Sequence, residues 1–365
     1  MMKWLFSLIF SLTVSNAFAI DFEDAIFPEF ATSGRALAMG NAFISKVDDA
    51  SAAFYNPAGL GSVRYPHLHL SNFHLEVNKG FLAAGTGGAI SDAASNATKM
   101  FSLAGTLDVL KTNVGALAHS RFHMLPNFTT RYLSFGYLLA KRTRAVVTDG
   151  ASATGFEIAD RLDHGPYGAL NFSLFGGVFK AGVSVLFLNR KEVITSVDPR
   201  LALNIDNSYK KGNGFFITSG VKLTIPVVFL PTFSATLHNS SAQKFQNARG
   251  AGAPDTIKQS IDVGFSVTPQ ISNASRLHFE INYKDLGGAF SNVSTTRKIL
   301  AGMELDIARV FFVRIGYGDG FGSAGLGVKS KKLEFDLTTY AVDTTAGSFR
   351  GREDRRFALS LSSGF

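Results

Sequence analysis

Two pairs of histidines stand at the short spacings that metal ligands often have. His67 and His69 would point to one face of a strand, and His119 and His123 would share one face of a helix. A structural zinc site needs four ligands, and the first pair has no carboxylate partner close by in the sequence. The plainer interpretation is that both pairs belong to polar faces, so we expect no metal and no cofactor.

The sequence offers little for enzymatic chemistry. It contains no nucleophile elbow, zinc motif or phosphate loop. The glycine-rich run at 318–322 is better explained as a hairpin turn than as a nucleotide loop. A hydrolase whose serine and histidine lie far apart in the sequence stays open as an alternative. We expect a protein that is not an enzyme.

The first residues have the pattern of a secretory signal. A lysine at position 3 precedes the apolar run 4–14, and Ala17, Phe18 and Ala19 form the small-x-small end at which such signals are cleaved. The run is shorter than the roughly 20 residues that a membrane-spanning helix needs. We therefore predict a signal peptide over 1–19 and a mature chain from Ile20. Because the sequence has no cysteine, disulfides and a lipidated N-terminus are excluded.

The composition is apolar for an exported chain, with 46% hydrophobic and 18% charged residues. No later segment is long enough for a membrane helix, so the apolar surface must enter either a large buried core or a transmembrane β-barrel. The net charge is +8. The basic residues are scattered and are not interleaved with stacking aromatics, so we expect no nucleic acid as a partner.

From position 131 onward, apolar residues alternate with polar or very small ones at the period of a β-strand. One face is apolar in segment after segment, as at Phe279, while the other carries charges, as at Glu280. Lipid outside and a hydrated lumen inside explain this contrast better than a soluble sandwich does. With a first strand at 67–77, bulged near 71–72, and another at 146–158, the sequence predicts an all-β fold: a transmembrane antiparallel β-barrel of about 14 strands.

The connections between the predicted strands alternate between long and short, as external loops and periplasmic turns do. The prediction includes a tight turn at 141–144 and a medium loop at 159–164. The longest connection, 80–127, has apolar residues at gaps of three and four from Met100 to Leu117, which predicts a helix inserted in a loop. The barrel is predicted to span 66–365, with both termini on the periplasmic side.

Residues 34–60, GRALAMGNAFISKVDDASAAFYNPAGL, differ from the strand pattern because they are rich in glycine, alanine and small polar residues. A short helix at 51–55 and a turn at the following Asn-Pro step are expected here. The stretch resembles the N-terminal hatch signature of the FadL/OmpP1/TodX family of outer-membrane transporters and of the related PorV-like outer-membrane proteins.

The resemblance implies a hatch over 20–65 that closes the lumen of a fourteen-stranded barrel. Glycines would let the hatch turn within a narrow lumen, and its arginine and aspartates would meet opposite charges on the inner wall. These residues would either hold the hatch in place or contact ligand. The matched positions are Gly34, Arg35, Met39, Gly40, Asp48, Asp49, Asn56, Pro57 and Ala58.

In the fatty-acid transporters of this family, hydrophobic ligands land among external loop helices, pass to an internal pocket and leave sideways through the wall. The resemblance therefore implies passive uptake of small hydrophobic molecules, such as long-chain fatty acids or similar lipids and aromatics, in the outer membrane of a Gram-negative-type bacterium. The candidate capture residues are Phe101, Leu103, Leu107 and Leu110, for which packing onto the barrel mouth is the competing explanation. The alternative function is a PorV-like barrel that binds exported proteins as a secretion or assembly accessory.

The C-terminal run 356–365 resembles the signal that the outer-membrane barrel assembly machinery recognises, and its apolar positions are Phe357, Leu359, Leu361 and Phe365. Basic residues at the predicted external strand ends would contact lipopolysaccharide phosphates or be ordinary solvated charges. They are Arg190, Lys191, Lys210, Lys211, Arg297, Lys298, Arg350, Arg352, Arg355 and Arg356. The expected partners are thus membrane lipid, lipopolysaccharide, the assembly machinery and a hydrophobic small molecule.

Overall fold

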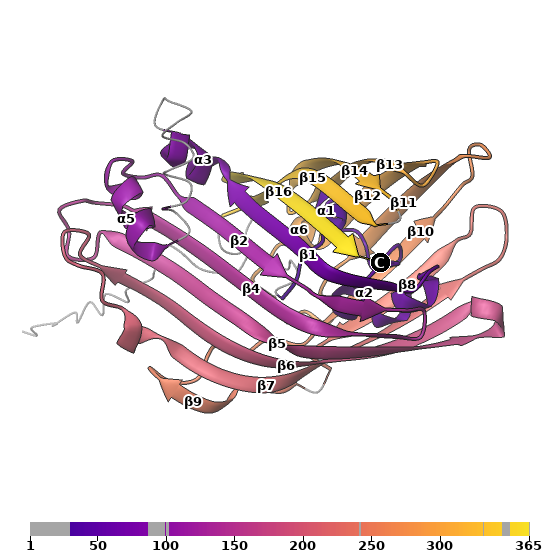
Figure 1. Ribbon diagram of the computed structural model, residues 1–365, viewed down its shortest axis with the longest axis horizontal. Helices are drawn as coiled ribbons and strands as arrows, with labels where there is room; N and C mark the ends of the chain where they lie inside the picture. The colour runs from indigo at the N-terminus through magenta and orange to yellow at the C-terminus, as the bar shows by residue number, and fades with distance from the viewer. Residues whose placement is uncertain are drawn as a thin grey trace, which may run out of the picture.

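The computed structural model describes residues 30–86, 99, 102–240, 242–330, 332–344 and 351–364. The predicted signal peptide lies outside the described residues. Sixteen strand segments form one antiparallel sheet, and the last strand also pairs with the first, so the sheet closes on itself (Figure 1). A closed sheet leaves no edge of unpaired backbone groups for lipid to cover, which is the condition for a strand-built membrane wall.

The strands follow one another around the wall in chain order. They are β1 (His67–Asn78), β2 (Ala118–Met124), β3 (Asn127–Thr129), β4 (Leu133–Val147), β5 (Phe156–Leu174), β6 (Phe179–Val197), β7 (Lys210–Thr224), β8 (Thr232–His238), β9 (Gln246–Gly250), β10 (Ser260–Val267), β11 (Ser275–Tyr283), β12 (Ile299–Ile307), β13 (Phe311–Gly318), β14 (Phe321–Lys329), β15 (Leu333–Asp343) and β16 (Glu353–Gly364). Both β2 and β3 pair with β1 and with β4, so they form one interrupted wall strand. Likewise, β8 and β9 both pair with β7. The wall therefore has fourteen strands, as predicted.

The two faces of the wall differ as the alternation predicts. Phe279 on β11 and Leu326 on β14 are 40% and 58% exposed on the outside. Their sequence neighbours on the inside, such as Glu280, are buried. An outer face this apolar is suited to lipid, whereas the charged inner face needs water or ion pairs.

Three parts of the predicted strand pattern are wrong, although their errors cancel in the count. The expected turn at 141–144 lies within β4, and the expected loop at 159–164 lies within β5. The stretch from 132 to 174, where three strands were predicted, therefore contains two long ones. The expected long loop at 80–127 contains β2, which restores the number. The charged run 159–164 suggested a loop, but its inward members are paired with other charges, Arg161 with Glu192 and Asp163 with Arg190. His119 and His123 accordingly lie on a strand and not on a helix.

The connections place helices mainly at one end of the barrel. The loop after β1 forms α3 (Lys79–Thr86) and α5 (Leu103–Lys111), so the predicted helix ends before Leu117. Shorter helical turns are η2 (Phe175–Gly177), η3 (Asp206–Ser208) and α6 (Thr295–Lys298). In the described part of the chain, no helix has the length and apolar character to span a membrane. The predicted bulge in β1 is confirmed, because the register with β16 shifts between His69 and Ser71.

We predict that Leu326→Arg destabilises the barrel, because a charged side chain on the lipid face at mid-strand costs about 2–4 kcal/mol. The free energy of unfolding, measured by urea titration in lipid vesicles, should fall by that amount. The control is Leu201→Arg in the loop between β6 and β7, where the side chain is 66% exposed. Equal effects of the two substitutions would contradict the assignment of the outer face to lipid.

Candidate functional site

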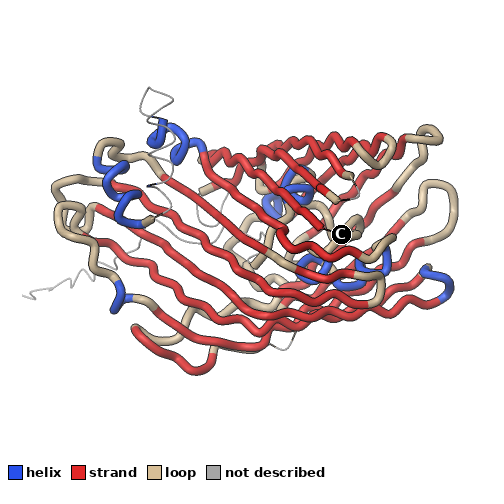
Figure 2. Tube along the Cα trace, viewed as in Figure 1, coloured by secondary structure: helices blue, strands red, loops and turns tan. Residues whose placement is uncertain are grey.

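Residues 30–66, the luminal segment, lie inside the ring of strands. They form α1 (Gly34–Ala38), α2 (Ala52–Tyr55) and η1 (Pro57–Ser62), so the predicted helix at 51–55 is confirmed. The first of these helices contacts β13 to β16, and η1 contacts the opposite stretch of wall, β5 to β7. Figure 2 shows them as short blue helices enclosed by red strands. The segment thus bridges two sides of the inner wall.

Glycines on both partners allow this close approach. Gly40 has a φ of 63°, a left-handed conformation that residues with a side chain adopt at a cost. Wall glycines face the segment: a Cβ atom on Gly316 would lie 2.1 Å from the carbonyl carbon of Met39, and one on Gly182 would lie 2.3 Å from that of Pro57. These wall positions therefore require glycine, because a side-chain atom added there would collide with the backbone of the segment.

Arg35 joins the segment to the wall through a buried ion-pair network. Its Nε lies 2.7 Å from one oxygen of Glu304 on β12, its Nη2 lies 2.9 Å from the other, and its Nη1 lies 2.6 Å from Asp48. Glu304 also accepts from Arg314 on β13 at 2.8 Å and lies 3.4 Å from Lys46. The prediction that Arg35 finds an opposite charge on the inner wall is therefore met by a forked carboxylate contact.

Burial and charge act against each other in this network. Burial alone would lower the pKa of Arg35, but the carboxylates of Asp48 and Glu304 raise it above its usual range. Burial likewise opposes the charge on Asp48, yet the Arg35 guanidinium holds the pKa of that carboxyl well below its usual range. Both groups are therefore ionised at neutral pH. Asp49 contributes more weakly, at 3.6 Å from Arg35, and accepts from Ser51.

Asn56 makes the second polar link. Its Oδ1 accepts from the backbone of Ala58 and so caps η1, while its Nδ2 donates to the carbonyls of Ile44 and, at 3.3 Å, of Val221 on β7. One side chain thus sets the turn at Pro57 and fixes it to the wall. The other predicted hatch positions, Gly34, Met39 and Ala58, are buried against the wall or within the segment.

A third link was missed by the sequence analysis. His74 on β1 and His123 on β2 stack with ring centroids 4.6 Å apart, and both contact Thr32 at the start of the luminal segment. The signal that could have found them is strand parity, because both belong to the inward face. His119 also faces inward, 2.6 Å from Glu76. The rings of His67 and His69 lie 4.5 Å apart, and among the described residues no group of three or more side chains could hold a metal ion.

The candidate capture residues lie on the outside of the wall. Leu107 and Leu110 of α5 are 4% and 0% exposed, and they cluster with outward residues of β4 and β5, namely Ala145, Val147, Phe156 and Ile158. These strand positions have the same parity as the lipid-facing Phe135 and Leu170. Leu103 is partly buried on the same cluster, and Phe101 lies outside the described residues. Figure 1 places α5 beside the loop ends of these strands.

Four of the predicted lipopolysaccharide contacts are buried in ion pairs within the protein, so that expectation is wrong for them. Arg190 pairs with Asp163, Arg297 with Asp319, Lys298 with Asp285 and Arg356 with Asp354, and all four cations are at most 6% exposed. Strand parity turns Arg190 and Arg356 inward although they stand near loop ends, whereas Arg297 and Lys298 belong to α6. Lys191, Lys210, Lys211, Arg352 and Arg355 are at least partly exposed, and Arg350 lies outside the described residues.

The predicted assembly residues belong to the strand that closes the barrel. Phe357, Leu359 and Leu361 on β16 pair with Val77, Leu75 and Phe73 on β1. Phe357 and Leu361 are 40% and 38% exposed on the outer face. Phe365 lies outside the described residues.

No protein-family model and no curated protein sequence matches the chain. Solved structures do match. The CymD monoaromatic hydrocarbon channel aligns at a TM-score of 0.50 and 8% identity over 92% of this chain and 98% of that one. A TodX monoaromatic hydrocarbon channel mutant aligns at 0.51 and 8% over 93% and 100%.

A Pseudomonas aeruginosa FadL homologue aligns at 12% identity over 92% of this chain and 99% of that one, with a TM-score of 0.47 that carries no weight by itself. At these identities the likeness concerns the arrangement of the chain in space. The fold of this chain is therefore that of the CymD and TodX channels.

Proposed function

We propose that the chain is an outer-membrane channel for passive uptake of small hydrophobic molecules, with the luminal segment as its hatch. The observation that carries the proposal is a buried segment that crosses the lumen of a closed barrel and is tied to both sides of its wall. The similar structures named as monoaromatic hydrocarbon channels support it. The chain needs no energy source for such transport, because a hydrophobic solute moves down its own gradient.

The contacts of the hatch suit a part that moves. Its links to the wall at Arg35 and Asn56 are polar, and water entering the lumen can replace each such hydrogen bond at a net cost of about 0.5–3 kcal/mol. Apolar side chains of the segment also pack with wall residues such as Leu138 and Tyr167, so burial holds it on that side, whereas the contact of Arg35 with Glu304 is polar. Displacement of α1 from Glu304 would therefore open the side of the lumen next to β12 and β13.

Lateral release has a candidate place in the wall. The ladder between β1 and β4 is interrupted at Leu125 and Pro126, where β2 ends and β3 begins. Proline lacks a backbone donor, so one ladder bond is missing there, although the amide of Leu125 donates to Asn72 and the carbonyl of Pro126 accepts from Tyr137. Leu125 packs with Leu138 in the same apolar cluster as the luminal segment. We propose that a solute freed by hatch movement leaves between these strands, into the surrounding lipid.

The role of α5 in capture is a proposal as well. Because Leu107 and Leu110 are covered, a solute would bind by lifting α5 from the outer faces of β4 and β5. The alternative function, a barrel that binds exported proteins, is not favoured by a specific feature of the described residues.

Tethering the hatch should stop uptake. A Cβ atom on Gly220 of β7 would lie 2.9 Å from Cγ of Asn56, so Asn56→Cys with Gly220→Cys places two thiols within bonding reach in a chain that has no other cysteine. Uptake of toluene into vesicles should fall to the protein-free level when the pair is oxidised and recover on reduction. The single Asn56→Cys variant is the control. Unchanged uptake by the oxidised pair would mean that the hatch does not move.

Arg35→Gln should loosen the hatch. It leaves Asp48 and Glu304 with one cation fewer in a buried site, a loss for which about 3 kcal/mol is typical. We expect lower stability to urea and faster basal toluene entry. Lys210→Gln, which breaks the exposed pair with Asp255, should cost less than about 1 kcal/mol and leave entry unchanged. If Arg35→Gln lowers stability without changing entry, the network is structural only.

A further inference from the structure

Two lysines of the inner wall, Lys180 on β6 and Lys222 on β7, converge on one residue of the luminal segment. They are directly opposite each other in the sheet, and we name them the lysine pair. Their Nζ atoms lie 3.0 and 3.2 Å from the hydroxyl oxygen of Ser62, at the end of η1. Because β6 begins and β7 ends beside the pair, it lies at the end of the barrel with the short turns, away from α3 and α5 (Figure 1).

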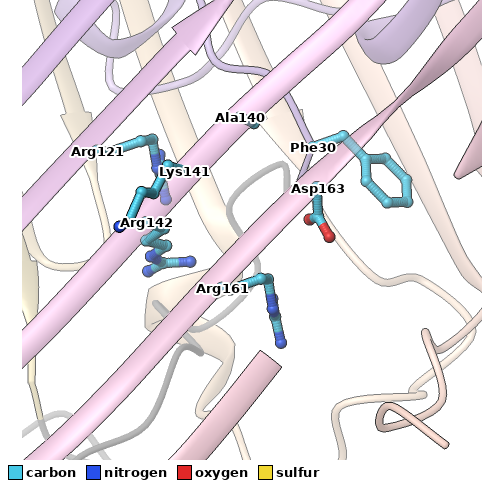
Figure 3. Close-up of a pocket in the computed structure, with 7 residues that line it drawn as sticks. All are labelled: Phe30, Arg121, Ala140, Lys141, Arg142, Arg161 and Asp163. Atoms are coloured by element: carbon cyan, nitrogen blue, oxygen red, sulfur yellow. The ribbon is translucent and has the colours of Figure 1, made fainter. Parts of the chain in front are cut away.

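Elsewhere in the lumen, inward cations have carboxylates close by. Figure 3 shows one such place, a small pocket on the inner side of the wall whose lining includes Arg161 and Asp163. Arg161 lies 2.8 Å from Glu192, and Asp163 lies 2.7 Å from Arg190. The lysine pair differs, because no carboxylate lies within 4 Å of either ammonium group in the part of the chain that the structure describes.

The positive charge of the pair is therefore not offset locally. Directly opposite residues on antiparallel strands have Cβ atoms about 5 Å apart, and like charges at that distance repel. Lys222 is only 6% exposed, so water screens it little. Attraction from Asp48 reaches Lys222 only from beyond ion-pair distance. Asp48 is itself held by Arg35 at 2.6 Å. An anion between the two ammonium groups would remove this repulsion.

The surroundings of the pair are rich in hydrogen-bond donors. An ammonium group has three N–H bonds, and each lysine uses one of them on Ser62. Because the oxygen of Ser62 accepts from both lysines, its own O–H bond is directed at a third group. Ser234 on β8 is directly opposite Lys222, is 6% exposed, and has a hydroxyl without a partner among the described residues. Such an excess of donors suits a ligand with several acceptor oxygens.

The place is fixed on one side and open on the other. A Cβ atom on Gly61 would lie 2.8 Å from Cδ of Lys180, so glycine allows the backbone of the luminal segment to lie against that lysine. Lys180 and Ser62 are both partly exposed, whereas Lys222 is buried. A ligand that enters from solution would thus meet Lys180 and Ser62 first and Lys222 at the inner end.

We propose that the lysine pair and Ser62 bind a phosphate group, and that the bound group joins the end of η1 to β6 and β7. A phosphate group carries up to two negative charges at neutral pH and three strong acceptor oxygens, which match two ammonium groups and a hydroxyl. The ligand belongs to a different class from the hydrocarbons named for the similar channels. The inference stands on this cluster alone and does not require transport.

The first test is equilibrium dialysis of radiolabelled inorganic phosphate against the full chain in mild detergent, at neutral pH and low ionic strength. We expect one phosphate per chain with a Kd below about 1 mM. Lys222→Gln should weaken binding at least about tenfold, because one charge-assisted hydrogen bond is lost. The matched control is Lys210→Gln, which removes an exposed lysine of the same strand that pairs with Asp255 and should leave the Kd unchanged.

A second arm identifies the source of the phosphate group. Dihexanoyl phosphatidic acid is added as a competitor, with dihexanoyl phosphatidylcholine, whose phosphate is covered by a cation, as its control. Displacement of labelled phosphate by the first lipid at concentrations below those of unlabelled phosphate would assign the site to a lipid head group. Displacement only at equal or higher concentrations would assign it to free phosphate. Both results support the shared phosphate chemistry.

The absence of saturable phosphate binding to the wild-type protein would overturn the proposal without reliance on any variant. An unchanged Kd in correctly folded Lys222→Gln would overturn it as well. Stability to urea separates binding from a purely structural role of the lysines. Phosphate should raise the urea midpoint of the wild type and of Lys210→Gln but not that of Lys222→Gln, because only a ligand that binds the folded state stabilises it. An equal rise in all three proteins would refute the site.

Discussion

Closure of the sheet between β16 and β1 is the constraint on which the other features depend. In lipid, every backbone donor and acceptor of the wall must be paired within the protein, and a closed antiparallel sheet achieves this. Closure also divides space into an apolar outside and an interior from which lipid is absent. The interior can therefore hold arginines and carboxylates, which would be costly on the outer face. Even the interruption at Pro126 is backed by apolar side chains of the luminal segment, which cover the break from within.

The fold was predictable because alternation over many strands is a repeated signal. Each segment such as 277–283 reports the same contrast between its faces, so errors in single strands do not change the architecture. The errors arose where the signal is ambiguous. Charges at 141–144 resembled a turn, and the histidines of β2 hid a strand behind a helical spacing. In both places polar residues face the lumen, where their ionic partners belong to other strands. Those partners lie far away in the sequence, as Glu76 does from His119.

The sequence indicated which residues belong to the site, but it did not indicate which residues they contact. Arg35 and the aspartates could be singled out as charges in need of partners, but Glu304 lies 269 residues away and only the register of the closed wall brings it near. The same holds for Thr32 and the stacked histidines. The wall glycines carried a signal that sequence analysis did not use. Gly182, Gly220 and Gly316 interrupt the inward faces of their strands where the luminal segment touches them.

The chemistry of these contacts argues for a metastable interior. An apolar plug in a polar lumen would be held by surface burial, which is non-directional and gradual, so small displacements would cost little and specificity would be low. Here the luminal segment packs its apolar side chains against the wall and is held in addition by directional contacts at Arg35 and Asn56 and by the close fit at Met39. Such contacts are lost together when the segment shifts by an ångström or two, because hydrogen bonds and glycine contacts tolerate little displacement. A barrel with the proposed function, which must remain closed to water and yet admit single solutes, would gain from this behaviour, since a segment held by such contacts would pass between well-separated arrangements with few between them.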